Sequence, residues 1–215
     1  MPPDSGKDNY ELRVFQSGCV QTRPENLHDW FNALVWLAFP RTKARVNAIH
    51  AETIPREGGR RGRLRDLLTI FDEGGALVVG DDAELIAMLQ EFRWKDLFWS
   101  HRQRMQERLR FVVLGHAVLE QALKPWPGIT CKAIVVPPGE ELDAQAAAWL
   151  AARGPGATPR DLAPLPIFGY PGWMSENAHA GFYDDARYFR LPDETRGKPG
   201  SASPRPRPRP PGGAR

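Results

Sequence analysis

The amino-acid sequence predicts an α+β fold, a helix-rich single domain built around one small sheet. Several segments repeat apolar residues with the 3.6-residue period of a helix, whereas residues 110–114 and 131–136 are short and β-rich. Of the 215 residues, 41% are hydrophobic, which is enough for a substantial core. We expect one globular domain over residues 1–192. Residues 193–215 are rich in Pro and Arg and cannot build a core, so a disordered tail is predicted there.

The positive charge of the chain lies in that tail. The formal net charge is +3, but residues 196–215 hold six basic and no acidic side chains, which leaves residues 1–195 with a net charge of −3. Nucleic-acid binding by the folded body is therefore not expected, because its charge balance is mildly acidic. Alternating Pro and Arg in the tail suits an anionic partner, or simply a solubilising extension.

The composition also indicates a cytoplasmic location. The longest apolar run covers residues 33–39, far short of the roughly 20 residues that span a bilayer. The opening residues are polar and do not have the pattern of a secretory leader. Cys19 and Cys131 make neither a disulfide framework nor a CxxC metal motif, so both are expected to be simple thiols.

The first third of the chain predicts one strand and two helices. Apolar and polar residues alternate over Tyr10–Phe15, which predicts a short strand. Asn26–Phe39 is apolar on nearly every side, which predicts a buried helix. Asn26 can cap that helix with Asp29 three residues on, and Pro40 ends it. Arg41–His50 is expected to continue as a second short helix.

A hairpin and two helices are expected next. Leu67–Asp72 and Ala76–Val79 are β-rich, and the turn Glu73–Gly75 separates them. Asp81 or Asp82 then caps a helix whose apolar stripe reaches residue 92. Residues 94–109 carry a stripe of their own and predict one further helix.

The second half alternates strands and helices. Strands are predicted at residues 110–114 and 131–136, and helices at residues 116–124 and 140–153. In residues 164–190 the apolar residues have no regular spacing, but Pro, Gly and aromatic residues are frequent. We expect this segment to be ordered and to wrap over the body, because its aromatic side chains need burial.

Several motifs in these segments resemble a known bacterial family, the domain of unknown function 3025. The motifs are residues 28–36 (HDWFNALVW) running into 39–43 (FPRTK), Asn47 with His50, 71–73 (FDE), 115–117 (GHA) with Glu120, 127–130 (PGIT), 171–173 (PGW) and 182–185 (FYDD). They span almost the whole body. The resemblance implies a soluble bacterial protein and supplies no activity.

Two groups of polar residues are candidate catalytic residues. His28, Asp29 and Asn32 lie at the start of an otherwise apolar helix, where a spacing of four puts His28 and Asn32 on one face. His116 and Glu120 share a face of a short helix that directly follows a strand, a common position for ligand sites. Helix capping and local hydrogen bonding remain the alternative for both groups, although capping does not explain Asn32.

Other residues are candidate metal or anion ligands. His50, Asp72 and Asp184 could join these histidines around a divalent metal ion, since a metal-assisted hydrolase needs three or four such ligands. Turn formation is the alternative role for Asp72 and Asp184. A third group, Arg41, Lys43 and Asn47, could bind an anion, or could form a solvated face.

Two hypotheses of function follow. In the first, these side chains line one pocket of a ligand-binding protein or metal-assisted hydrolase that takes a small molecule or an anion. In the second, the chain is a non-catalytic module that binds a protein or nucleic acid through exposed aromatic residues between 171 and 189, or through the tail. The first hypothesis predicts that the polar residues converge in space, and the second that they are scattered.

Overall fold

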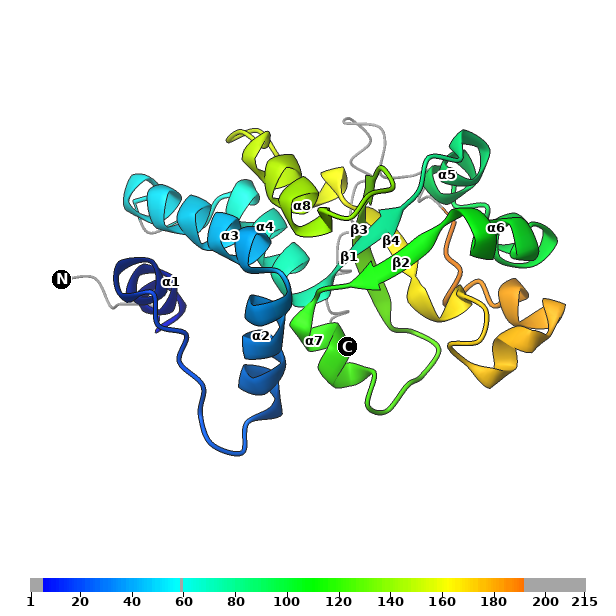
Figure 1. Cartoon of the computed structure of the whole chain (residues 1–215), viewed down its shortest axis with the longest axis horizontal. Coiled ribbons are helices and arrows are strands. Elements are labelled where there is room, and N and C mark those ends of the chain that lie inside the picture. Colours follow the sequence, from blue (N-terminus) through cyan, green and yellow to red (C-terminus); the bar gives the residue numbers. More distant parts are fainter. Residues whose placement is uncertain (1–5, 59, 192–215) are drawn as a thin grey trace, which may run out of the picture.

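A computed structural model describes residues 6–58 and 60–191. For residues 6–9 it describes only the backbone. Within them a four-stranded mixed sheet has helices on both sides (Figure 1), and the predicted helix-rich α+β fold with one small sheet is confirmed. The predicted tail from residue 193 lies outside the described residues. No helix in the described part of the chain is long and apolar enough to cross a membrane.

The sheet has the strand order β2-β1-β3-β4. Strand β1 (Gly75–Val79) pairs antiparallel with β2 (Arg110–Val113) and parallel with β3 (Thr130–Val136), and β3 pairs antiparallel with β4 (Ala163–Pro166). Strand β1 is apolar on both faces, and β3 is so from Ala133 to Val136, as expected for strands that are covered on both sides.

The sheet separates two hydrophobic clusters. Alternate residues of β1 point to opposite faces, so that Ala76 and Val78 join one cluster while Leu77 and Val79 join the other. The first cluster contains α5 (Ala83–Gln90), α6 (Arg102–Arg108) and the C-terminal aromatic residues. The second is built mainly by α4 (Arg63–Gly74) and α8 (Leu142–Ala151).

The predicted strand at Tyr10–Phe15 is wrong. These residues belong to helix α1 (Gly6–Ser17), which packs on α3 (Pro40–Thr53). Only Val14 of this segment is fully buried, and Tyr10 and Glu11 lie one turn before it. A helix presents these three side chains together, whereas a strand would turn Glu11 away from the other two. The alternation within six residues was too short to separate the two periods.

The predicted helix at Asn26–Phe39 is confirmed as α2 (Leu27–Ala38), and the next helix is confirmed as α3. Asn26 caps α2 by accepting a hydrogen bond from the backbone N–H of Asp29 at 2.9 Å. Pro40, expected to end α2, also begins α3, where a residue without N–H is well tolerated. The expected burial of α2 on all sides is wrong, because only Asp29, Asn32 and Val35 are buried.

The predicted hairpin at residues 66–82 is half wrong. Residues 67–72 form part of α4, not a strand, while residues 76–79 are in β1 as expected. Leu64, Leu67, Leu68 and Phe71 are all buried, with the i, i+3, i+4, i+7 spacing of one helix face. Their β-branched and aromatic neighbours suggested a strand, but this stripe decides the conformation. The expected turn is absent, and α4 runs directly into β1.

The helix predicted over residues 94–109 is interrupted. A π-helical turn covers Asp96–Ser100 and α6 follows it, and the stripe residues Leu97, Phe98 and Met105 are buried. The helix before it is confirmed as α5, whose Asp82 cap accepts from the Leu85 N–H at 3.2 Å. The remaining predicted elements are confirmed as β2, α7 (His116–Gln121), β3 and α8.

The C-terminal segment packs over the sheet, as its aromatic content predicted. It contains the unpredicted strand β4 and three 3-10 turns, at Ile167–Gly169, Ser175–Ala178 and Ala180–Asp184. Two further 3-10 turns are at Ile54–Arg56 and Pro159–Asp161. Tyr183, Tyr188 and Phe189 are buried, so the hypothesis that residues 171–189 expose their aromatic side chains to a partner is wrong for these three residues.

Gly115 joins β2 to α7 at a point where only glycine fits. A Cβ atom there would lie 2.5 Å from Gly74 Cα and from Gly75 N, which are backbone atoms. Gly115→Ala should therefore destabilise the fold by about 2 kcal/mol or more. Gly154→Ala is the matched control, since nothing lies within 4 Å of a Cβ atom at that position. Urea denaturation measures both, and equal stability of the two variants would contradict the close approach.

Candidate functional site

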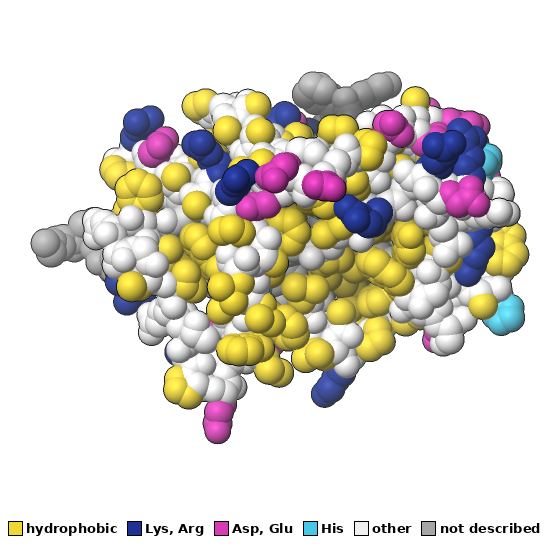
Figure 2. Space-filling model, in the orientation of Figure 1, with side chains coloured by type: hydrophobic (Ala, Val, Ile, Leu, Met, Phe, Trp, Pro, Cys, Tyr) yellow, Lys and Arg dark blue, Asp and Glu magenta, His cyan; other side chains and the backbone are white. Residues whose placement is uncertain are grey.

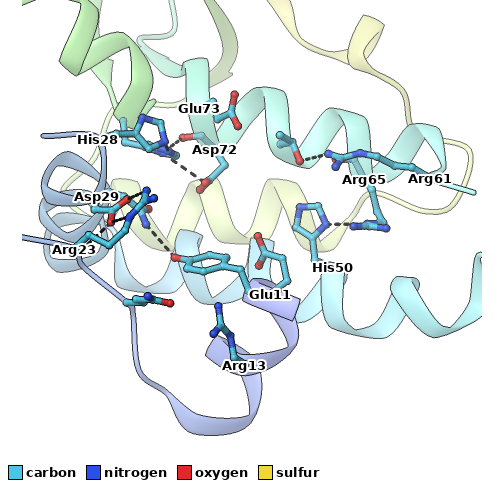
Figure 3. A pocket seen from close by; sticks show the side chains of 15 residues that line it. Glu11, Arg13, Arg23, His28, Asp29, His50, Arg61, Arg65, Asp72 and Glu73 are labelled. Atoms are coloured by element: carbon cyan, nitrogen blue, oxygen red, sulfur yellow. Dashed lines mark hydrogen bonds and ion pairs between the residues drawn. The ribbon is translucent and has the colours of Figure 1, made fainter. Parts of the chain in front are cut away.

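A cavity of about 410 Å³ opens between α1, α2, α3, α4 and the start of α7 (Figure 3). Its size is that of a small-molecule site. Most of the side chains that line it are polar or charged. They are Tyr10, Glu11, Arg13, Gln21, Arg23, His28, Asp29, Asn32, His50, Arg61, Arg65, Thr69, Asp72, Glu73 and His116. Six of the predicted site residues are among them: His28, Asp29, Asn32, His50, Asp72 and His116.

Helix α2 brings three of these residues to the cavity. Asp29 accepts two hydrogen bonds from the Arg23 guanidinium, at 2.7 and 2.8 Å, and one from the Arg23 backbone N–H at 2.9 Å. These bonds to Arg23 lower the pKa of Asp29 to about 2. Asp29 therefore holds the loop before α2 in place, while His28 and Asn32 face the interior of the site.

His28 and His116 contact each other directly. Their Nε2 atoms are 3.1 Å apart, and the rings meet edge to face with centroids 4.5 Å apart. His28 Nδ1 lies 3.0 Å from Glu120 Oε2, and His116 Nδ1 lies 2.8 Å from the backbone oxygen of Asp72. Glu120, which is on α7 one turn after His116, thus joins the site although it does not line the cavity.

These contacts restrict where the protons of the two rings can be. A carbonyl oxygen only accepts, so His116 Nδ1 must carry a hydrogen, and ionised Glu120 requires the same of His28 Nδ1. The two Nε2 lone pairs would then repel each other across 3.1 Å unless one proton lies between them. The arrangement is satisfied when the two rings share a single positive charge.

His116 is the more buried member of the pair. Burial lowers the pKa of its ring, and the nearby carboxylate of Asp72 opposes this only in part. His28 is the accessible member of the pair, because its side chain is 42% exposed. The pair therefore consists of a buried ring and an accessible ring.

A buried lysine holds Asp72 in position. Lys43 donates to Asn32 Oδ1 at 2.7 Å, forms an ion pair with Asp72 Oδ1, and lies 5.5 Å from the centre of the Trp36 ring. Its side chain is only 5% exposed. Burial raises the pKa of Asp72, but Lys43, the nearby histidines and the hydrogen bond from Lys43 outweigh it, and the net shift is downward. A continuous series of contacts thus leads from Lys43 through Asp72 and His116 to His28.

The other side of the cavity contains residues that the sequence reasoning did not select. Tyr10 OH accepts a hydrogen bond from Asn32 Nδ2 at 3.0 Å, and Glu11 Oε2 accepts one from Asn47 Nδ2 at 2.6 Å. Burial raises the pKa of both Tyr10 and Glu11. In Figure 3 Glu11 points from α1 toward the space between Asp72 and His50. Because Tyr10 and Glu11 fall in the segment mistaken for a strand, their shared position with α2 and α3 was not foreseen.

Arginine side chains lie along the same side. Arg65 donates from Nε to His50 Nδ1 at 3.3 Å and forms an ion pair with Glu57 at 3.1 Å. Arg61 forms an ion pair with Asp66 at 2.8 Å. The charges in this part of the cavity are therefore paired within the protein, and they give the cavity a mixed polar lining instead of a simple positive one.

The three residues of the predicted anion site lie apart in the structure, and so do the predicted metal ligands. Arg41 points to the surface, where it donates to Glu141 at 3.0 Å, whereas Lys43 is buried and Asn47 binds Glu11. Asp184 forms an ion pair with Lys95 at 2.6 Å and does not line the cavity, while His50 and Asp72 do. In residues 6–58 and 60–191, no three His, Cys, Asp or Glu side chains are grouped as a metal site would need.

The Lys43–Asp72 pair should stabilise the fold through its burial. Lys43→Met leaves the Asp72 carboxylate without its counter-charge and should cost about 3–5 kcal/mol in urea denaturation at pH 7. The double variant Lys43→Met/Asp72→Asn should recover part of that loss, because no buried charge remains unpaired.

Arg41→Met is the control on the same helix. Arg41 and Glu141 are 64% and 75% exposed, and breaking such a pair should cost less than about 1 kcal/mol. Equal losses for Lys43→Met and Arg41→Met would contradict the role assigned to the buried pair.

Comparison with known proteins identifies the family and gives no activity. The family model described as "Protein of unknown function (DUF3025)" matches residues 2–192, which include every element and every cavity residue described above. No curated protein and no solved structure matches the chain. The matched range covers nearly all of the 215 residues, and the chain therefore belongs to the DUF3025 family.

Proposed function

We propose that the cavity is the active site of an enzyme that hydrolyses a small polar substrate, with the His28–His116 pair as its acid–base group. The observation that carries this proposal is the 3.1 Å approach of the two Nε2 atoms while both Nδ1 atoms contact acceptors. In this geometry the pair would hold one mobile proton at the cavity wall. A group that binds and releases a proton there is what general acid–base catalysis uses.

His28 would exchange the proton with the substrate or with water, because it is the exposed member of the pair. His116 would take up the proton through its Nε2 lone pair, and Glu120 would stabilise the charge on His28. In hydrolysis the pair would first give its shared proton to the leaving group, which frees its Nε2 lone pairs. It would then take one proton from the attacking water, so that the pair ends in the state in which it began. The polar lining favours a substrate with several hydrogen-bonding groups.

A divalent metal ion between the two Nε2 atoms is the second candidate. Metal-binding histidines commonly donate their other ring N–H to a carboxylate or a carbonyl oxygen, as Glu120 and Asp72 allow here. The described residues bring no third His, Cys, Asp or Glu to this point, so such an ion would depend on water or substrate for its remaining ligands. The proton is therefore the preferred occupant.

The test uses chromogenic carboxylic and phosphoric esters with the purified full chain. His28→Gln should lower the rate on any ester that the protein cleaves by about 10²–10⁴-fold, the usual contribution of an acid–base group. His179→Gln is the matched control, since His179 is an exposed residue outside the cavity. Equal rates for His28→Gln and the unmodified chain would contradict the proposal.

Metal analysis of the same preparation separates the two candidates. A stoichiometric metal ion that is lost in His28→Gln would support the second candidate. Cleavage that persists after treatment with a chelator would support the first.

A further inference from the structure

Helix α2 has the reverse of the usual arrangement of a surface helix. Its buried residues are Asp29, Asn32 and Val35, of which two are polar. On the other face Leu27, Trp30, Leu34 and Leu37 are 54%, 56%, 39% and 80% exposed. A helix that packs on its own domain normally turns its apolar stripe inward. The cavity takes the polar face of α2, so the apolar face remains outside. We refer to these four exposed side chains as the α2 seam.

The spacing of the α2 seam matches that of a helix–helix contact. Its members follow one another at intervals of three, four and three residues, which is the a/d pattern of a helix that packs against another helix. The two ionisable side chains of α2, His28 and Asp29, both contact the rest of the site. The outer face of α2 therefore carries no charge that would oppose contact with an identical face.

The apolar surface continues beyond α2. Helix α7 packs beside α2, and the residues just after it include Leu123 and Trp126, which are 57% and 54% exposed. Figure 2 shows hydrophobic side chains gathered over the region of α2 and α7. A fully exposed aromatic side chain offers on the order of 150–250 Å², and a leucine side chain is near the lower end of that range. These six side chains then present on the order of 600 Å², at the top of the range for the largest apolar patch of a monomer.

We propose that the α2 seam is the interface of a homodimer, in which it packs against the α2 seam of a second copy of this chain. Together with Leu123 and Trp126, the seam would contribute about 600 Å² from each copy and about 1,200 Å² in total, which reaches the lower limit for stable association. A two-fold axis brings the same patch together from both copies, and an uncharged apolar stripe is complementary to itself. Apolar character is also what distinguishes homodimer interfaces from other surfaces.

The interface would lie back to back with the candidate active site. One face of α2 holds His28, Asp29 and Asn32 toward the cavity, and the opposite face would contact the partner. Dimerisation would thereby fix α2 from both sides. The proposal does not depend on the function of the cavity, because it rests only on the outer face of α2.

Sedimentation equilibrium of the full chain over roughly 1–100 µM tests the proposal. The unmodified chain should be a dimer, and Leu37→Glu should weaken the dimer at least about 30-fold by placing a charge within the interface. Leu191→Glu is the matched control, since Leu191 is 74% exposed and lies outside the seam. It should dimerise like the unmodified chain. Leu37 is the most exposed of the four seam residues, so its substitution should not unfold the protein.

A cross-linking experiment tests whether the two copies meet at the α2 seam. Leu34→Cys in a Cys19→Ser background should form a disulfide-linked dimer on mild oxidation, because it lies near the middle of the seam. Leu191→Cys in the same background should not. Cys131, the remaining native thiol, is buried, and burial raises its pKa to about 12, so it does not interfere.

Two results would overturn the proposal. One is a monomer at every concentration. The other is a dimer that Leu37→Glu leaves unchanged. A monomer that binds phosphatidylcholine–phosphatidylglycerol vesicles through the seam, and loses this binding in Leu37→Glu, would overturn it in favour of a lipid surface.

Discussion

The candidate site depends on one buried ion pair, between Lys43 of α3 and Asp72 of α4. Burying both charges is costly, so the pair persists only because other groups satisfy it: Asn32 accepts from Lys43 at 2.7 Å, and His116 lies against Asp72. Asn32 comes from α2 and His116 from α7. The pair thus connects four helices, and its requirement for polar partners explains why α2 turns its polar face inward. The exposed apolar seam of α2 is a consequence of the same constraint.

Local patterns were sufficient for much of the fold. The spacing of apolar residues and the capping residues were enough to predict two strands and five helices. These are β2, β3, α2, α3, α5, α7 and α8. The errors arose where the apolar residues fit both the two-residue period of a strand and the 3.6-residue period of a helix. Residues 67–72 are β-rich by composition, but their burial repeats with helical spacing, and six residues at 10–15 are too few to distinguish the periods. Strand β4 is Ala-Pro-Leu-Pro, and only its pairing with β3 makes it a strand.

The candidate site was partly foreseeable. A histidine and an amide on an apolar helix, and a second histidine after a strand, indicated that His28, Asn32 and His116 need polar partners. Glu120 was expected to partner His116, whereas in the structure it contacts His28. The sequence could not show that Lys43 is buried while Arg41, two residues earlier, is exposed, because this depends on how α3 packs. Glu11 and Tyr10 were not selected because their helix was mistaken for a strand.

The central claim is that one proton lies between His28 Nε2 and His116 Nε2, and nuclear magnetic resonance of protein labelled with ¹⁵N at histidine tests it most directly. We predict a ¹⁵N–¹⁵N coupling across the hydrogen bond that joins the two Nε2 nuclei, with His116 protonated at Nδ1. The coupling should disappear in His28→Gln. A His116 ring protonated at Nε2 alone, with no coupling to His28, would contradict the account.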